Sequence, residues 1–260
     1  MALLFICTME GAQLRANLND LFIHEFLRRY FQAHQPENCE RLLDLGCGTR
    51  PYAALYTDPR RITTTADIET RVTAISVISS ASALPFAAES FDTVLLSEVI
   101  EHVEDEHLVI SEIMRVLKPD GTLLITWPFN YAMHEQPHDY RRPTEFGMAA
   151  LLRRHGLQPF EIMRRGDIVG LLSTLLGQLV NGSAAWFRRL PFAGPIFAPI
   201  VWLLSMIVYG TDVLYFVATK RTARLHPKEV GEPTQGIAHF LTTWTLGYCM
   251  AARKQRTSDA

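Results

Sequence analysis

Residues 41–48, RLLDLGCG, decide the fold class of this chain. A short apolar run that ends in a pair of glycines predicts a buried strand followed by a tight turn. Because Gly46 and Gly48 lack a Cβ atom, the turn can adopt unusual φ values and let a ligand approach the backbone. In an open α/β sheet, ligands bind beyond the carboxyl ends of the strands. The turn is therefore a candidate binding site, although a glycine pair also occurs in ordinary strand-to-turn connections.

Working outward from this stretch, the pattern alternates between strands and helices. Apolar and β-branched runs predict strands, and apolar residues at helical spacing predict helices. The expected strands cover residues 41–45, 61–69, 72–78, 92–96, 121–128 and 160–165, and the expected helices cover residues 10–30, 107–117 and 143–155. Residues 118–121, KPDG, are expected to end a helix and turn the chain, and Pro143 to lie in the first turn of its helix. This order predicts an α/β fold with a mostly parallel sheet.

The 260 residues include 25 Lys and Arg against 27 Asp and Glu, so the chain lacks the basic surface typical of nucleic-acid binding. Its four cysteines show neither a CxxC spacing nor a zinc-ligand pattern, which favours a reducing, cytoplasmic compartment. The apolar residues 2–7 follow no basic residue, so we do not expect a secretory signal. They are either a frayed end or precede a true start at Met9.

Residues 168–180 and 196–218 are strongly apolar, and Asn181-Gly182 and several prolines interrupt them. We expect an N-terminal helical segment (1–38), a sheet domain (39–167), a hydrophobic helical insertion (168–240) and a last strand with a tail (241–260). A single membrane-spanning helix is disfavoured because Asp212 would lie deep in lipid. The alternatives are peripheral membrane contact through residues 168–224, at the inner face of the membrane, and a lid or dimer surface.

Two acidic residues near the glycine turn limit which ligands it can bind. Asp67 ends the second predicted strand, where a carboxylate can accept hydrogen bonds from both hydroxyls of a ribose. Asp44 stands two residues before Gly46, where it can face an ammonium group. Pro51 occupies the position of the third glycine in a dinucleotide fingerprint, so a nicotinamide cofactor is disfavoured. An acid for a cationic amino-acid moiety and an acid for a ribose suit S-adenosylmethionine.

Four segments of the chain, in order and spacing, resemble the motifs of class I S-adenosylmethionine-dependent methyltransferases, in the branch related to the quinone-biosynthesis methylases. They are LLDLGCGTRPY, TADIE, ALPFAAESFDTVLLSEVIEHV and EIMRVLKPDGTLLITWPF, within residues 41–129. The resemblance implies a Rossmann-like, seven-stranded, mostly parallel sheet with helices on both faces. It also implies that residues 245–253 form a last, antiparallel strand, after the insertion.

The resemblance also assigns residues around the cofactor. Positions that match the family's cofactor-binding segments are Asp44, Gly46, Cys47, Gly48, Asp67, Ile68, Ser82, Ala83, Leu84, Ser97 and Glu98. Many relatives carry an acid before the LPF segment that accepts from the adenine amino group. Here residues 79–82 read SSAS, so we expect a serine hydroxyl to accept in its place.

A second polar cluster, residues 134–144 (HEQPHDYRRPT), follows the fifth predicted strand and resembles a stretch of methyltransferases associated with saccharide or envelope biosynthesis. Methyl transfer requires alignment and, for a hydroxyl acceptor, a base. The candidates for the base are His138 and His134, with His102 as a further one, and Asp139, Tyr140 and Arg141 would shape the acceptor pocket. The alternative is structural: an Asp139–Arg141 salt bridge, a packed His138, and Thr144 at the start of a helix.

The sequence thus predicts a methyltransferase that uses S-adenosylmethionine, needs no metal, and methylates a small-molecule or lipid- or saccharide-linked acceptor, at oxygen. Carbon methylation of a quinone-like ring is the alternative acceptor chemistry. A catalytically idle module that binds the cofactor and acts as a membrane or assembly partner is the alternative of another class.

Overall fold

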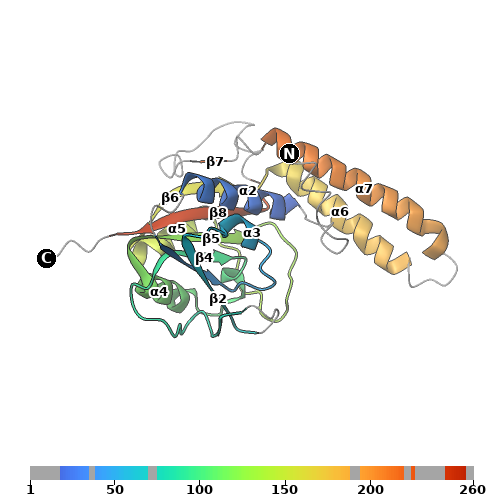
Figure 1. Ribbon diagram of the computed structural model, residues 1–260. Coiled ribbons are helices and arrows are strands. Elements are labelled where there is room, and N and C mark those ends of the chain that lie inside the picture. Colours follow the sequence, from blue (N-terminus) through green and yellow to red (C-terminus); the bar gives the residue numbers. More distant parts are fainter. Residues whose placement is uncertain are drawn as a thin grey trace.

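The computed structural model describes residues 18–34, 39–69, 75–187, 194–219, 224–225 and 244–255 (Figure 1). The apolar stretch 2–7 and Met9 lie outside these residues, as does the part of the first predicted helix that precedes residue 18.

One twisted sheet forms the centre of the molecule, with the strand order β3-β2-β1-β4-β5-β8-β6-β7. β8 runs antiparallel to both β5 and β6, while β1 to β5 pair in parallel, so the predicted Rossmann-like sheet is confirmed. The strand that exceeds the predicted seven is β7, which has only two residues and is too short for a sequence pattern to predict. The strands are β1 (Glu40–Leu45), β2 (Arg61–Asp67), β3 (Val77–Ile78), β4 (Phe91–Ser97), β5 (Leu117–Pro128), β6 (Leu157–Arg164), β7 (Arg224–Leu225) and β8 (Gly247–Lys254).

Helices cover both faces of the sheet (Figure 1). They are α2 (Leu18–Ala33), α3 (Ala53–Tyr56), the 3-10 turn η1 (Ile100–His102), α4 (Glu106–Val116), α5 (Glu145–Arg154), α6 (Ile168–Phe187) and α7 (Gly194–Thr219). Alternate strand residues point to opposite faces. Leu43 and Leu123 therefore join the core under α4 and α5, whereas Leu42 and Leu124 join the core under α2 and α3.

Two predicted boundaries differ from the structure. Thr144 is the N-cap of α5, and its hydroxyl accepts from the Gly147 N–H, so Pro143 lies before the helix and not in its first turn. Residues 118–121 belong to β5 and form an irregularity in its pairing with β4. Asp120 there has a φ of 62°, so the predicted change of direction is made by a bulge inside the strand.

The apolar insertion forms a helical hairpin, α6 and α7, that projects from the sheet (Figure 1). α6 continues through Asn181-Gly182, so the predicted break there is wrong; such residues cost only about 1 kcal/mol in a helix, which packing between helices can offset. Pro195 lies in the first turn of α7, where a missing N–H costs little, whereas Pro199 lies in the second turn and does not end the helix. Among the described residues, no helix has the length and apolar character required to cross a membrane.

Candidate functional site

The glycine turn lies at the carboxyl end of β1, between β2 and β4. Gly46 and Gly48 have φ values of 69° and 49°, in the left-handed region that side chains disfavour. A Cβ atom on Gly46 would lie 2.3 Å from Cγ2 of Val99, whereas one on Gly48 would meet nothing within 4 Å. Gly46 is therefore required by packing as well as by φ, and the backbone at Gly48 is open to a ligand.

The carboxylate of Asp67 fixes the shape of this turn. Its Oδ2 accepts from the Gly48 N–H at 2.8 Å, and its Oδ1 accepts from the Glu69 N–H at 3.2 Å. A carboxylate offers about four acceptor positions, so hydrogen-bonding capacity remains for a ligand.

Asp44 is a buried carboxyl group beside the turn. Its Oδ2 accepts from the Tyr56 hydroxyl at 2.5 Å. Burial raises the pKa of Asp44 to about 6, and the negative charge of Asp67 adds to this effect, while Tyr56 and Arg50 oppose it. A cationic group placed next to Asp44 would relieve this cost, because it favours the ionised carboxylate.

A cavity of about 1090 Å³ extends from this turn along the carboxyl edge of the sheet. Of the residues predicted from the sequence, the ones that line it are Asp44, Gly46, Cys47, Gly48, Asp67, Ile68, Ser82, Ser97, Glu98, His102, His138 and Tyr140. The sequence reasoning missed Tyr52, Val99 and Glu135, which also line it. Each of the three lies in a segment that the sequence singles out, LLDLGCGTRPY, ALPFAAESFDTVLLSEVIEHV or HEQPHDYRRPT, which was the available signal.

Ala83 and Leu84 do not line the cavity. Leu84 is buried in the core; its N–H donates to Glu112 at 2.7 Å and its carbonyl accepts from Arg115. These contacts anchor the segment to α4 and leave the preceding serines facing the cavity. Among them, the hydroxyl of Ser79 is buried and has no hydrogen-bond partner among the described residues.

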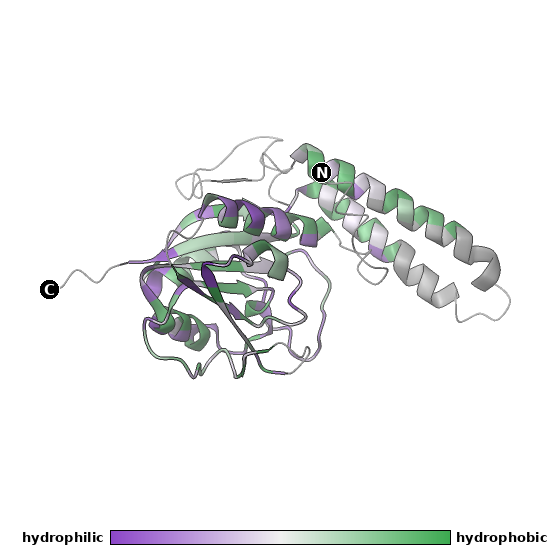
Figure 2. Cartoon of the chain, viewed as in Figure 1, coloured by the Kyte–Doolittle hydropathy of each residue, from purple (hydrophilic) through white to green (hydrophobic). Residues whose placement is uncertain are grey.

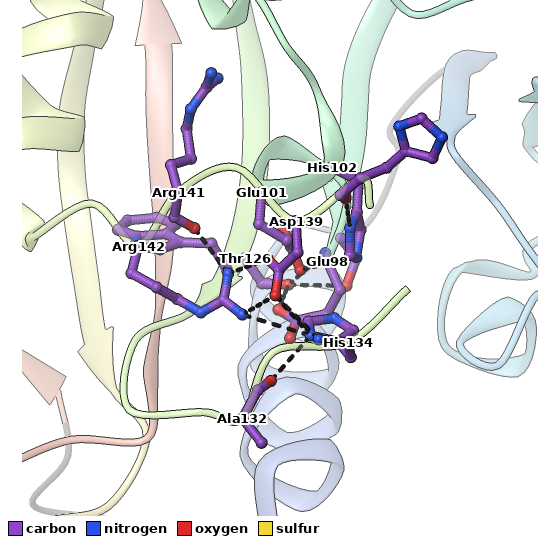
Figure 3. A network of polar contacts seen from close by, with 12 residues as sticks. Glu98, Glu101, His102, Thr126, Ala132, His134, Asp139, Arg141 and Arg142 are labelled. Atoms are coloured by element: carbon purple, nitrogen blue, oxygen red, sulfur yellow. Dashed lines mark hydrogen bonds and ion pairs between the residues drawn. The ribbon is translucent and has the colours of Figure 1, made fainter. Parts of the chain in front are cut away.

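At the other end of the cavity, Glu98 follows β4 with a φ of 54°. Its Oε1 accepts from the Thr126 hydroxyl at 2.8 Å and lies 3.2 Å from a guanidinium nitrogen of Arg165, which is fully buried (Figure 3). The carboxylate is therefore turned toward the interior of the sheet and stabilised there by a positive charge.

His102 has a fixed ring orientation. Its Nδ1 lies 2.6 Å from the carbonyl oxygen of His138, and a carbonyl can only accept, so Nδ1 carries the proton. The neutral ring then presents an unprotonated Nε2, 3.7 Å from Oε1 of Glu101. Glu101 is fully buried, and neither carboxylate oxygen has a hydrogen-bond partner among the described residues. Burial, followed by the charge of Glu98, raises the pKa of Glu101 well above its usual value.

The contacts of the second polar cluster differ from those expected. Asp139 pairs with Arg142, at 2.5 and 2.7 Å, and not with Arg141. Arg141 instead reaches the start of α4, where it pairs with Glu106 at 2.5 Å and donates to the Glu104 carbonyl. The hydrogen bonds from Arg142 hold the pKa of Asp139 at about 2. Arg141, Asp139 and His134 do not line the cavity.

Asp139 positions the loop that carries His134. Its Oδ2 accepts from the His134 N–H at 3.0 Å, and the rings of His134 and His102 meet edge to face with centroids 4.7 Å apart (Figure 3). One donor atom each from Glu101, His102 and His134 lie within 4.8 Å of one another. Within the described part of the chain, these three residues form the grouping that could hold a metal ion.

Comparisons with known proteins agree with this geometry. Residues 43–125 match the family model of a methyltransferase domain. The chain is 30% identical over 132 residues to an uncharacterized methyltransferase of Mycolicibacterium vanbaalenii, covering 45% of this chain and 52% of that protein. It is 34% identical over 138 residues to the mitochondrial ubiquinone biosynthesis O-methyltransferase of Bos taurus, covering 42% and 36%. The chain thus spans about half or less of the length of these relatives.

The fold also matches that of a solved methyltransferase. The 1,6-didemethyltoxoflavin-N1-methyltransferase of Burkholderia thailandensis superposes with a TM-score of 0.52 and 16% identity. The match covers 97% of this chain and 86% of that one. At this identity the likeness concerns the fold alone.

Proposed function

Because the chain carries a class I S-adenosylmethionine-dependent methyltransferase domain, we propose that it transfers a methyl group to an acceptor hydroxyl next to His102. One observation carries this proposal. A single cavity joins the glycine turn, with Asp44 and Asp67, to His102 and His138 at its other end. A donor bound at the first end and an acceptor at the second would meet inside it.

The residues at the glycine turn fit S-adenosylmethionine. Asp44 is a buried carboxyl group that accepts from the Tyr56 hydroxyl, and it would pair with the ammonium group of the methionine moiety. Asp67 keeps free acceptor positions for the ribose hydroxyls. The Ser79 hydroxyl, which has no partner in the described part of the chain, would accept from the adenine amino group, the role that an acid fills in many relatives.

Bound S-adenosylmethionine supplies an electrophilic methyl group on a sulfonium with a neutral leaving group. The protein therefore has to align the acceptor and accept its proton. Nε2 of His102 is the atom best prepared to accept, because the His138 carbonyl fixes the proton on Nδ1. The proton of the acceptor hydroxyl passes to Nε2, and the imidazolium formed in this way lies 3.7 Å from Oε1 of Glu101, whose oxygen atoms stabilise its positive charge.

This assignment gives the other histidines positioning roles. His138 acts through its backbone carbonyl, and its Nδ1 lies 3.0 Å from the Tyr140 hydroxyl. His134 packs on the ring of His102 and is held by Asp139. Both remain alternatives for the base, and single substitutions separate them, as described in the Discussion.

One relative indicates the class of the acceptor. The Bos taurus relative is named as an O-methyltransferase of ubiquinone biosynthesis, which supports methylation at oxygen. We place the acceptor among small molecules, including lipid- and saccharide-linked ones. Carbon methylation of a quinone-like ring is the competing chemistry.

Mass spectrometry of cell extracts, incubated with the purified chain and methyl-deuterated S-adenosylmethionine, tests the proposal. We expect a labelled product that is absent with the His102→Ala variant, and fragmentation that places the label on oxygen. A label on ring carbon supports the competing chemistry. Binding of S-adenosylhomocysteine without any labelled product from extracts that contain lipid and polar fractions supports a non-catalytic module and contradicts the proposal.

A further inference from the structure

The α6–α7 hairpin exposes apolar side chains where a helix in contact with water usually exposes polar ones. Exposed side chains along its outer face are apolar, among them Leu172, Leu176, Leu179, Leu203, Ile207 and Leu214. Figure 2 shows green, apolar segments in the coloured parts of both helices, interrupted by white and purple ones. Monomeric soluble proteins rarely expose a continuous apolar surface of this kind, so the outer face requires a partner.

Several polar groups of the hairpin are buried, whereas Gln178 and Thr211 are exposed. Asp212, the one charged residue in the sequences of both helices, is 9% exposed and bonds to Ser173 on α6. Burial raises the pKa of Asp212 above its ordinary value, and the hydrogen bond from Ser173 opposes this effect. The hydroxyl of Thr174 is buried as well. Polar groups inside and leucines outside is the arrangement that a hydrocarbon environment selects.

We propose that the outer face of this hairpin docks on an anionic lipid bilayer and lies in one leaflet. A second copy of the chain fits less well. A helix-to-helix seam uses a narrow apolar stripe flanked by charges, whereas α6 and α7, of 20 and 26 residues, offer a broad apolar face without flanking charges. In the sequence, Arg188-Arg189 follow α6 and Lys220-Arg221 follow α7, and basic residues at such positions favour anionic headgroups.

The hairpin is attached at the edge of the sheet that carries the cavity. α6 starts directly after β6, which runs in the same direction as β5, so it leaves from the carboxyl edge. Its base is fixed to the domain: the Tyr215 hydroxyl accepts from the Asp167 N–H at 2.9 Å, and Phe216 meets Phe22 of α2 edge to face. Docking would therefore bring the cavity to the bilayer surface. If the chain is a methyltransferase, as proposed above, its acceptor would then be lipid-linked. This consequence rests on the proposed function, whereas the docking itself does not.

Flotation of the full chain with vesicles of phosphatidylglycerol and phosphatidylethanolamine tests the docking. The test variant is Leu172→Glu with Leu176→Glu, at side chains that are 59% and 52% exposed. The matched control is Ile62→Glu with Phe146→Glu, which changes side chains of 54% and 53% exposure on the sheet domain. We expect wild type and control to float, and the partition of the hairpin variant to fall about tenfold or more, because two charges would enter the apolar layer.

Thermal stabilisation by S-adenosylhomocysteine reports whether each variant is folded, and it also tests the proposed function separately from the docking. Failure of the wild type to float, or equal flotation of the hairpin variant, overturns the docking. A third result also overturns the docking: light scattering shows a dimer for the wild type but not for the hairpin variant, and neither protein binds vesicles. That result assigns the outer face to a second copy of the chain. A chain that floats but is not stabilised by the nucleoside retains the docking and contradicts the methyl-transfer proposal alone.

Discussion

The two ends of the cavity are built in different ways. The end at the glycine turn is organised around one short stretch, residues 44–48, whose shape is set by its own backbone φ values and by contacts with Val99 and with the carboxylate of Asp67. The histidine end is assembled from η1 and from the loop 134–142, which meet only in the folded chain. The first end is organised around one local turn, whereas the second consists of two segments and depends entirely on the contacts between them. Substitutions at the two ends should therefore differ in what they damage.

The largest effect is expected at the histidine end. His102→Ala should lower turnover about 10²–10⁴-fold, because it removes the proposed base, while the affinity for S-adenosylhomocysteine stays unchanged. His138→Ala keeps the backbone carbonyl that orients His102 and should cost far less. The control is His107→Ala, on α4, which does not line the cavity. Steady-state kinetics with the identified acceptor measures all three; a large loss for His138→Ala with a small one for His102→Ala reverses the assignment.

At the glycine end, damage should appear as lost stability and binding. Gly46→Ala should lower the free energy of unfolding by about 2–4 kcal/mol, because the new Cβ combines left-handed backbone strain with the Val99 clash. Gly48→Ala should cost only the strain, about 1–2 kcal/mol. Chemical denaturation measures both. The double variant Gly46→Ala, Val99→Ala should recover part of the loss; equal losses for Gly46→Ala and Gly48→Ala would contradict the steric argument.

Asp44 links charge to cofactor binding at the same end. Asp44→Asn should weaken S-adenosylhomocysteine binding about 10–100-fold by removing the partner of the ammonium group. The pKa of about 6 lies above the unfolded value of roughly 3.9, so the ionised carboxylate destabilises the free protein above pH 6, and this cost disappears below about pH 4. The free Asp44→Asn variant should consequently melt about 2 °C or more higher than wild type at pH 7.5.

The same group predicts a pH dependence. Wild-type affinity should fall as pH drops through 6, since protonation removes the charge that the ammonium group requires. The Asp44→Asn variant should bind weakly without this dependence. Asp58→Asn, at a carboxylate on the surface that pairs with Arg60, is the control and should behave as wild type. Titration calorimetry between pH 5 and 8 checks both; identical profiles for wild type and Asp44→Asn would show that another group controls binding.

The smallest effect concerns the adenine contact. Ser79→Ala should weaken S-adenosylhomocysteine binding about threefold to tenfold, the value of one neutral hydrogen bond, because its buried hydroxyl has no other partner among the described residues. Ser80→Ala should change little, since the Ser80 hydroxyl already bonds to Ser82 at 2.8 Å. If Ser80→Ala weakens S-adenosylhomocysteine binding more than Ser79→Ala does, the adenine contact belongs to Ser80.

The contrast between the two ends also explains how far the sequence predicts the molecule. β1, β2 and β4 follow from short apolar runs, and the glycine turn from its own residues, because those signals are local. The antiparallel place of β8, between β5 and β6, came from the family resemblance, since it joins segments more than 80 residues apart. α6 passing through Asn181-Gly182 was not predictable, because packing in the hairpin outweighs local propensity.

At the histidine end, the residue types were predictable and their partners were not. Two neighbouring arginines follow Asp139, and only the folded loop decides that Arg142 pairs with it while Arg141 turns to Glu106. Glu101 directly precedes His102 in the sequence, but its lack of hydrogen-bond partners among the described residues depends on η1 packing against β5. The exclusion of Leu84 from the cavity likewise follows from its anchoring to α4.

Titration calorimetry of S-adenosylhomocysteine into the purified chain tests the central claim most directly. The account predicts one binding site per chain at pH 7.5, with affinity that falls in acid and is weakened about 10–100-fold by Asp44→Asn but not by His102→Ala. Absence of binding heat at several temperatures, with a chain shown to be folded, would contradict the account.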